Sequence, residues 1–283
     1  MNLHERAMIV RVSISQWTAR RYDKKVSDKV EKDYGSKDSG RWNKILISRE
    51  AIQEIQSLCG EARQYIYRKT WAWGDNGDRV LPNHSFSEVD AELKNYKRKF
   101  DERVEKFCMN YPALIEEAKE RLNGMFSKDD YPDPSRIQER FDFRIGYFPI
   151  PQAGDFRVSL DISEAEKIKA AIKEENDRLL QIANRELWER IFKNVSHMAE
   201  RLADVKAIFR DSLVENIKEL CDELDKLNIM QDKDLKEMVD RIRTHLSGED
   251  PDELRNNRKL RKEIAKEAND ILIEIETKRK LIL

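Results

Sequence analysis

A stretch of 64 residues, from 164 to 227, contains neither proline nor glycine. Apolar residues recur along it in steps of three or four: Ile191, Val195, Met198, Leu202, Val205, Phe209, Leu213, Ile217, Leu220, Leu224 and Leu227. This spacing is typical of a coiled-coil seam, with one extra four-residue step between Phe209 and Ile217 that locally unwinds a supercoil. The run predicts one unbroken helix roughly 95 Å long, at about 1.5 Å per residue.

A helix of that length needs a partner along its seam. A shorter helix is expected over 232–246, and Pro251 favours the start of a final helix that continues to near the C-terminus. This last helix could cover the seam within one chain, or the seam could pair between copies. The sequence favours self-association, so we expect a homo-oligomer.

The first half of the chain has mixed periodicity. Residues 8–18 alternate as a strand does. A short basic helix and a loop follow over 20–43, and helices are expected over 48–70, 86–109, 112–126 and 135–143. Residues 144–160 favour a hairpin that the N-terminal strand could join.

These patterns predict a mainly α fold with a small β-sheet (α+β). We expect long antiparallel helices with coiled-coil-like packing and a two- or three-stranded antiparallel sheet. The expected boundary lies near 162, between a mixed α+β region (1–162) and a long helical region (163–283).

Composition narrows the function classes. Charged residues make up 39 % of the chain, yet the net charge is −1, which argues against a dominant role in binding polyanions. Three separated cysteines suit a reducing compartment, and no apolar run reaches the roughly 18 residues of a membrane span. The sequence predicts a soluble, cytoplasmic protein without a membrane partner.

Catalytic signatures are missing from the sequence. It has no GxxxxGK[ST], GxGxxG, HExxH or GxSxG motif, and its four histidines lack the spacing of metal ligands. We therefore expect no catalytic residues, no metal site and no cofactor.

The most unusual segment carries two tryptophans beside an Asn-Gly turn. Its candidate partner-binding residues are Trp71, Trp73, Asp75, Asp78 and Arg79. The two rings either anchor the loop to the core or form an exposed hot spot, because tryptophan is enriched in both settings. Asp75, Asp78 and Arg79 are also the only candidates for an unrecognised enzymatic site.

Two basic runs suggest nucleic-acid binding as an alternative. The first contains Trp17, Arg20, Arg21, Lys24 and Lys25, and the second Arg255, Arg258, Lys259, Arg261 and Lys262. Cations interleaved with aromatic rings can contact phosphates and stack on bases. The competing interpretations are that Trp17 lies in the core and that the second run is a solvated helix face.

Three blocks together resemble an uncharacterised family, a domain of unknown function carried by tailed phages and plasmids. They are VSISQWTARRYDKK at 12–25, TWAWGDNGDRVLP at 70–82 and GYFPIPQAGDFRV at 146–158. The resemblance implies a phage or mobile-element origin, a bacterial cytoplasm, and a setting beside AAA+ ATPases or DNA-metabolism genes. It implies no catalytic residues.

The expected function is that of a non-enzymatic interaction protein. It would be an elongated helical scaffold, adaptor or inhibitor acting on a host or phage protein, with an AAA+ ATPase among the candidate partners. The alternative is a nucleic-acid-associated accessory protein of phage DNA metabolism or recombination.

Overall fold

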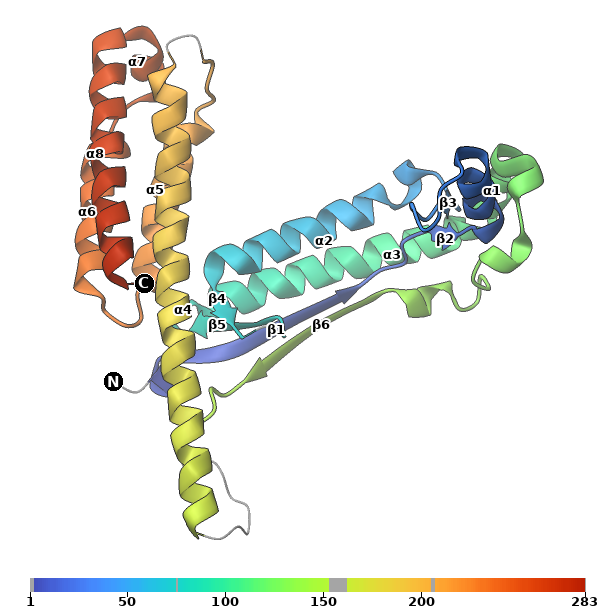
Figure 1. The fold of residues 1–283 in the computed structure, drawn as a ribbon, viewed down its shortest axis with the longest axis horizontal. Coiled ribbons are helices and arrows are strands. Elements are labelled where there is room, and N and C mark those ends of the chain that lie inside the picture. Colours follow the sequence, from blue (N-terminus) through green and yellow to red (C-terminus); the bar gives the residue numbers. More distant parts are fainter. Residues whose placement is uncertain (1–2, 75, 153–161, 205–206, 283) are drawn as a thin grey trace. The chain divides into compact units, whose positions relative to one another are not determined.

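A computed structural model describes residues 3–74, 76–152, 162–204 and 207–282. The chain is mainly helical with small antiparallel sheets, which confirms the predicted fold class (Figure 1). It divides into two compact units. Unit 1 comprises Met1–Arg11, Ile66–Val89 and Tyr147–Leu283, and unit 2 comprises Val12–Tyr65 and Asp90–Gly146. This division differs from the predicted boundary at 162, because Trp71 and Trp73 share one core with the C-terminal helices.

Unit 1 is built on helices α4 (Ile162–Ala203), α5 (Ser212–Leu227), α6 (Lys233–Leu246), α7 (Pro251–Asn256) and α8 (Arg258–Ile282). Helix α4 contacts α5 and α8, and α6 contacts the same two helices, so α4, α5, α6 and α8 enclose a common core. Figure 1 shows α5, α6 and α8 beside the C-terminal half of α4. Short connections between successive helices give the antiparallel arrangement of a helical bundle.

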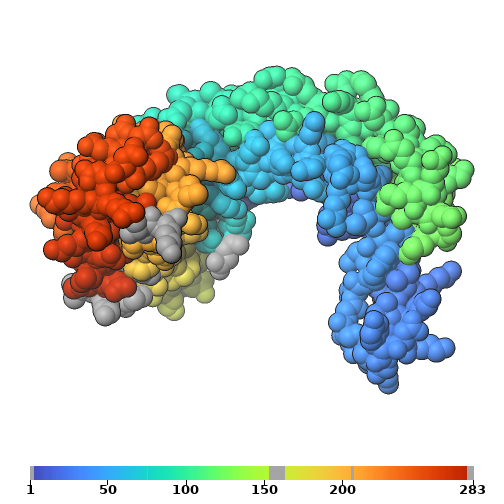
Figure 2. Space-filling view, turned by 90° about the horizontal axis from the view of Figure 1, so that it is seen from above, coloured from blue at the N-terminus to red at the C-terminus, as the bar shows by residue number. Residues whose placement is uncertain are grey.

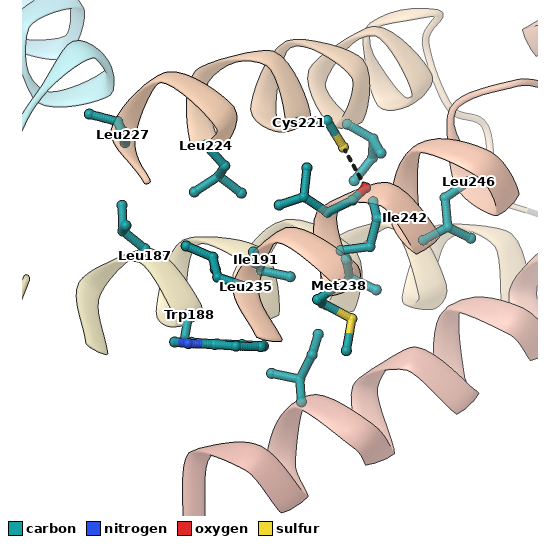
Figure 3. Packing of buried hydrophobic residues seen from close by; sticks show 14 of the residues in the cluster. Leu187, Trp188, Ile191, Cys221, Leu224, Leu227, Leu235, Met238, Ile242 and Leu246 are labelled. Atoms are coloured by element: carbon teal, nitrogen blue, oxygen red, sulfur yellow. Dashed lines mark hydrogen bonds between the residues drawn. The ribbon is translucent and has the colours of Figure 1, made fainter. Parts of the chain in front are cut away.

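The apolar seam faces the inside of this bundle. In Figure 3, Leu187 and Ile191 of α4 point toward residues of α5 and α6, and Cys221 lies close to the carbonyl of Val239. The buried seam residues include Ile191, Val195, Met198, Leu202, Leu213, Ile217, Leu224 and Leu227. Helices of the same chain therefore cover the seam, and it no longer argues for self-association.

The predicted unbroken helix over 164–227 is wrong. Helix α4 ends at Ala203 and α5 begins at Ser212, without any proline or glycine between them. The break lies mostly before the extra four-residue step, which was expected between Phe209 and Ile217. Two arginines from a later part of the chain contact this break and are described below.

The main sheet has the strand order β4-β5-β1-β6. Its strands are β1 (Ala7–Ser15), β4 (Trp71–Trp73), β5 (Asp78–Pro82) and β6 (Asp142–Phe148). Strand β5 runs antiparallel to both neighbours, with Val80 opposite Trp71 on one side and Ile9 on the other. The sequence predicted only a turn over 71–79, whereas the structure forms a hairpin around Gly77, whose φ of +82° suits glycine. The second arm of the hairpin predicted at 144–160 lies outside the described residues.

Unit 2 holds most of two long helices, α2 (Arg49–Lys69) and α3 (Phe86–Leu122). Helix α2 confirms the prediction over 48–70. Helix α3 runs through Pro112, where the sequence predicted a new helix. Phe107, Tyr111 and Ala118 are buried on both sides of the proline, and this packing compensates for the hydrogen bond that proline cannot donate. The helix expected over 135–143 is instead a 3₁₀ turn (Ile137–Arg140) followed by β6.

The remaining elements are short. Unit 2 also contains helix α1 (Lys24–Tyr34) and a two-stranded sheet of β2 (Arg20–Tyr22) and β3 (Asn43–Ile45). Further 3₁₀ turns span Leu3–Glu5, Asn83–Ser85, Asn123–Met125 and Lys128–Asp130.

Candidate functional site

The tryptophans of the β4–β5 hairpin are core residues. Trp71 is 1 % exposed and Trp73 is 6 % exposed, and both belong to the apolar core of unit 1. Two rings this deeply buried do not offer the exposed hot spot that the sequence allowed. The rings instead anchor the hairpin to the core, which is the other interpretation that the sequence allowed.

Asp78 is engaged in a bidentate ion pair. Its two carboxylate oxygens accept from Nε and Nη2 of Arg11, at 2.6 and 2.8 Å. The pair joins strands β1 and β5, next to the opposed residues Val10 and Arg79. Asp75, the other acidic candidate of this segment, lies outside the described residues.

Arg79 belongs to a partly buried polar network in unit 1. Its Nε donates to Thr70 Oγ1 at 2.6 Å, and its guanidinium lies 3.4 Å from Glu186 Oε1. Glu186 Oε1 also accepts from Arg190 at 2.6 Å, and its Oε2 accepts from the amide of Ala72 at 2.9 Å. The Glu186 carboxylate therefore accepts from two guanidinium groups and one backbone amide.

The same network fixes the ionisation of Glu186. Burial alone would raise the pKa of this carboxyl, but Arg190, the Ala72 amide and Arg79 outweigh burial and lower the pKa. The carboxylate is thus held charged between two guanidinium groups. Asp78 and Arg79, the described candidates for an enzymatic site, both serve internal contacts in this conformation.

Two arginines of the second basic run donate hydrogen bonds at the break between α4 and α5. Arg261 is 6 % exposed. Its guanidinium donates to the carbonyl oxygens of Leu202 at 3.0 Å, Arg201 at 2.8 Å and Ala207 at 3.1 Å. These contacts satisfy carbonyl groups that the end of α4 leaves without a helical partner.

Arg255 contacts the residues of the same turn that come just before α5. It donates to the carbonyl oxygen of Phe209 at 3.3 Å and pairs with the carboxylate of Asp211. Both Arg255 and Arg261 lie 5.2 Å from the centre of the Phe209 ring. Both guanidinium groups contact this turn, and the prediction that they bind nucleic acid stays a prediction.

The other members of that run are exposed: Arg258, Lys259 and Lys262. Nζ of Lys259 lies 3.9 Å from Oε1 of Glu263, one helical turn away. This geometry fits the solvated helix face that the sequence offered as the alternative.

Trp17 packs in the core of unit 2. Its ring meets Tyr111 edge-on, with centroids 5.5 Å apart and planes at 89°, and Phe107 lies 6.3 Å away. Trp17 is thus partly buried against this core, as the competing interpretation expected, and its stacking role stays a prediction. The four cations predicted beside it, Arg20, Arg21, Lys24 and Lys25, are exposed.

These four cations belong to a surface that sequence reasoning identified only in part. We call residues 20–42 the tip surface; it consists of β2, α1 and the connection to β3. Figure 2 shows this part of the chain (blue) as a narrow projecting lobe. Three aromatic rings of the tip surface are exposed: Tyr22 by 45 %, Tyr34 by 84 % and Trp42 by 38 %.

Helix α1 is held in place mainly by polar contacts. Ser27 is its one fully buried residue. Asp23 caps the helix by accepting from the amide of Val26 at 3.1 Å, and Gly35 ends it with a left-handed φ of 63°. The amide of Trp42 donates to Ser27 Oγ at 3.0 Å, which links the residue just before β3 to helix α1. The apolar side chains of the tip surface are therefore not needed to bury a core.

A buried ion cluster lies at the base of the tip surface. Nζ of Lys44, whose side chain is 8 % exposed, lies 2.7 Å from Asp130 and 3.4 Å from Asp23. Burial alone would lower the pKa of Lys44, but the two carboxylates raise it. The pKa of Asp23 lies below its ordinary value, chiefly because the Val26 amide donates to it and also because Lys44 is near.

The lowered pKa of Asp23 predicts that acid loosens α1. Capping and ion pairing by Asp23 are complete above its unfolded pKa near 4 and are lost as the pH falls through the lower folded value. In an NMR titration, the Val26 amide should shift at this low pH in the wild type. Asp23→Asn keeps a capping oxygen without the charge, so this shift should disappear, whereas the exposed control Asp28→Asn should retain it. Equal titrations in the wild type and Asp23→Asn would contradict the assignment.

Metal and membrane sites are not found in the described part of the chain. Its histidine, cysteine and acidic residues form no group of three or more that could hold a metal ion. None of its helices combines the length and apolar character that a membrane crossing requires.

Comparison of the chain with protein-family models, curated proteins and solved structures finds no match. The resemblance to the phage and plasmid family stays a prediction, and function is argued from the geometry of this chain.

Proposed function

We propose that this protein is a non-enzymatic binding protein that holds a negatively charged partner at the tip surface. One observation carries the proposal. Exposed aromatic rings lie among exposed cations in a short segment whose own structure does not require those rings. Such a combination is typical of contact surfaces, where aromatic and basic side chains supply much of the binding free energy.

Several exposed cations of the tip surface have no acidic partner. Some exposed basic side chains of α3 do have one, such as Lys94 with Asp90 at 2.7 Å and Arg98 with Glu102 at 2.6 Å. Arg20, Lys24 and Lys25 have no carboxylate within 4.0 Å in the described part of the chain. Their charges are therefore available to a partner.

The wider setting of this function is also proposed. An acidic protein and a nucleic acid both carry the charge that the tip surface requires. The predicted action in a bacterial cytoplasm, on a host or phage partner that includes AAA+ ATPases among the candidates, is compatible with such a surface. Assembly of several copies stays a prediction that the buried seam no longer supports.

A charge-reversal variant tests the proposal. Lys25→Glu combined with Lys29→Glu reverses two exposed charges one helical turn apart on α1. Immobilised wild-type protein should retain a defined set of molecules from a bacterial lysate, with and without nuclease treatment, and the variant should lose most of that set. Quantitative mass spectrometry and nucleic-acid staining provide the measurement.

The matched control reverses two charges of unit 1. Lys259→Glu combined with Lys262→Glu also exchanges two exposed lysines on a helix. The control should capture the same set as the wild type. Equal capture by the wild type and the α1 variant, with unchanged circular dichroism, would refute the proposal.

A further inference from the structure

We infer that the partner of the tip surface is a single-stranded polynucleotide, bound without sequence preference. The inference rests on the proposed function and names the class of its partner. Cations would contact successive phosphates while exposed ring faces stack on the bases between them. Three features of the tip surface carry this step: the placement of its rings, its local charge and its projecting form.

The exposed rings flank helix α1. Tyr22 immediately precedes the Asp23 cap and Tyr34 is the last helical residue. The amide of Asp23 donates to the carbonyl oxygen of Trp42 at 3.0 Å, so Trp42 lies at the same end of α1 as Tyr22. Eleven residues of helix span roughly 16 Å, so rings at the two ends can receive different bases of one strand.

The local charge of the tip differs from that of the whole chain. Residues 20–42 contain eight basic and five acidic residues, which gives a net charge of +3, against −1 for the chain. Lys24, Lys25, Lys29 and Lys32 follow one another along the exposed surface of α1. The guanidinium of Arg41 lies 5.8 Å from the Tyr22 ring, which places a cation directly beside a stacking surface.

The exposed rings favour a single strand over a duplex. Bases in a duplex are stacked on one another, so only an unpaired strand offers their faces to Tyr34, which is 84 % exposed. A protein hot spot usually fills a well-packed pocket. The tip surface instead projects in Figure 2, and stacking on a flexible strand requires no pocket.

Fluorescence anisotropy with a labelled twenty-residue oligo(dT) measures the binding directly. The wild type should bind at low salt. If the net charge of +3 corresponds to three phosphate contacts, the slope of log K against log salt should be about −2, at roughly −0.7 per phosphate. Tyr34→Ala should weaken binding roughly 5- to 100-fold and leave the salt slope unchanged. Lys25→Glu with Lys29→Glu should both weaken binding and flatten the slope.

Controls separate this inference from other sources of binding. Lys259→Glu with Lys262→Glu should bind oligo(dT) as the wild type does, and oligo(U) should compete with oligo(dT). Duplex DNA should bind more weakly, and Tyr34→Ala should not alter that residual binding.

Several results would overturn the inference: no binding of oligo(dT) at 20 mM salt, equal loss in the unit 1 control, equal binding of duplex, or binding of phosphatidylserine vesicles alone. If oligonucleotides fail to bind but the α1 variant still abolishes capture after nuclease treatment, the proposed function stands and only this inference falls. If neither oligonucleotides nor lysate components depend on α1, both fall.

Discussion

Replacement of Arg261 by methionine is expected to lower the free energy of unfolding of unit 1 by about 3 kcal/mol. Methionine keeps much of the apolar stem but removes the guanidinium that satisfies carbonyl oxygens of Arg201, Leu202 and Ala207. A buried polar group left without a partner costs about 1–3 kcal/mol, and here several lose one donor together. Urea denaturation followed by tryptophan fluorescence measures the effect, because Trp71, Trp73 and Trp188 all belong to unit 1.

The neighbouring residue provides the control for Arg261. Lys262 is exposed, and Lys262→Met should change the free energy of unfolding by less than about 0.5 kcal/mol, as is usual for surface substitutions. Similar midpoints for Arg261→Met and the wild type would show that the α4–α5 turn does not depend on this guanidinium.

Removal of the Glu186 side chain should be still more damaging. Glu186→Ala leaves the Arg79 and Arg190 guanidinium groups, whose side chains are 12 % and 19 % exposed, without their shared carboxylate. Breaking a buried ion pair by removal of one partner typically costs about 3–5 kcal/mol. The same urea measurement should show this loss, whereas Glu174→Ala, at an exposed position of α4, should not.

A double-mutant cycle identifies the origin of the Glu186 effect. Glu186→Ala combined with Arg190→Ala should cost less than the sum of the two single substitutions, because the second removes a charge that the first left unpaired. Strict additivity would mean that Glu186 acts through packing alone.

Local patterns in the sequence predicted most helices but not the point where the longest one ends. The ranges predicted over 48–70 and 232–246 match α2 and α6, and Asp232 caps α6 by accepting from the amide of Leu235. The end of α4 is contacted by Arg261, 59 residues further along the chain than Leu202. A contact over that separation leaves no signal in the residues around the break.

The candidate site, too, depends on tertiary contacts that local sequence patterns do not reveal. The sequence singled out the basic residues of the tip surface, but it assigned the stacking ring to Trp17, which the structure places against Tyr111. Tyr34 and Trp42 drew no attention, because only the tertiary structure shows which rings a core leaves uncovered. The poor apolar content of 20–42 was the one available signal, since a segment with little to bury cannot hide its aromatic residues.

The division of the chain into interleaved segments has a consequence for its synthesis on the ribosome. All residues of unit 2 have been made once position 146 has been added, with Ile66–Val89 as an insertion within it. Unit 1 combines Met1–Arg11 with helices that reach Ile282, so its core cannot be completed before the last helix has been made. Domains generally fold as units during translation. The interleaving therefore orders the process in time, with all residues of unit 2 made while unit 1 still lacks its C-terminal helices.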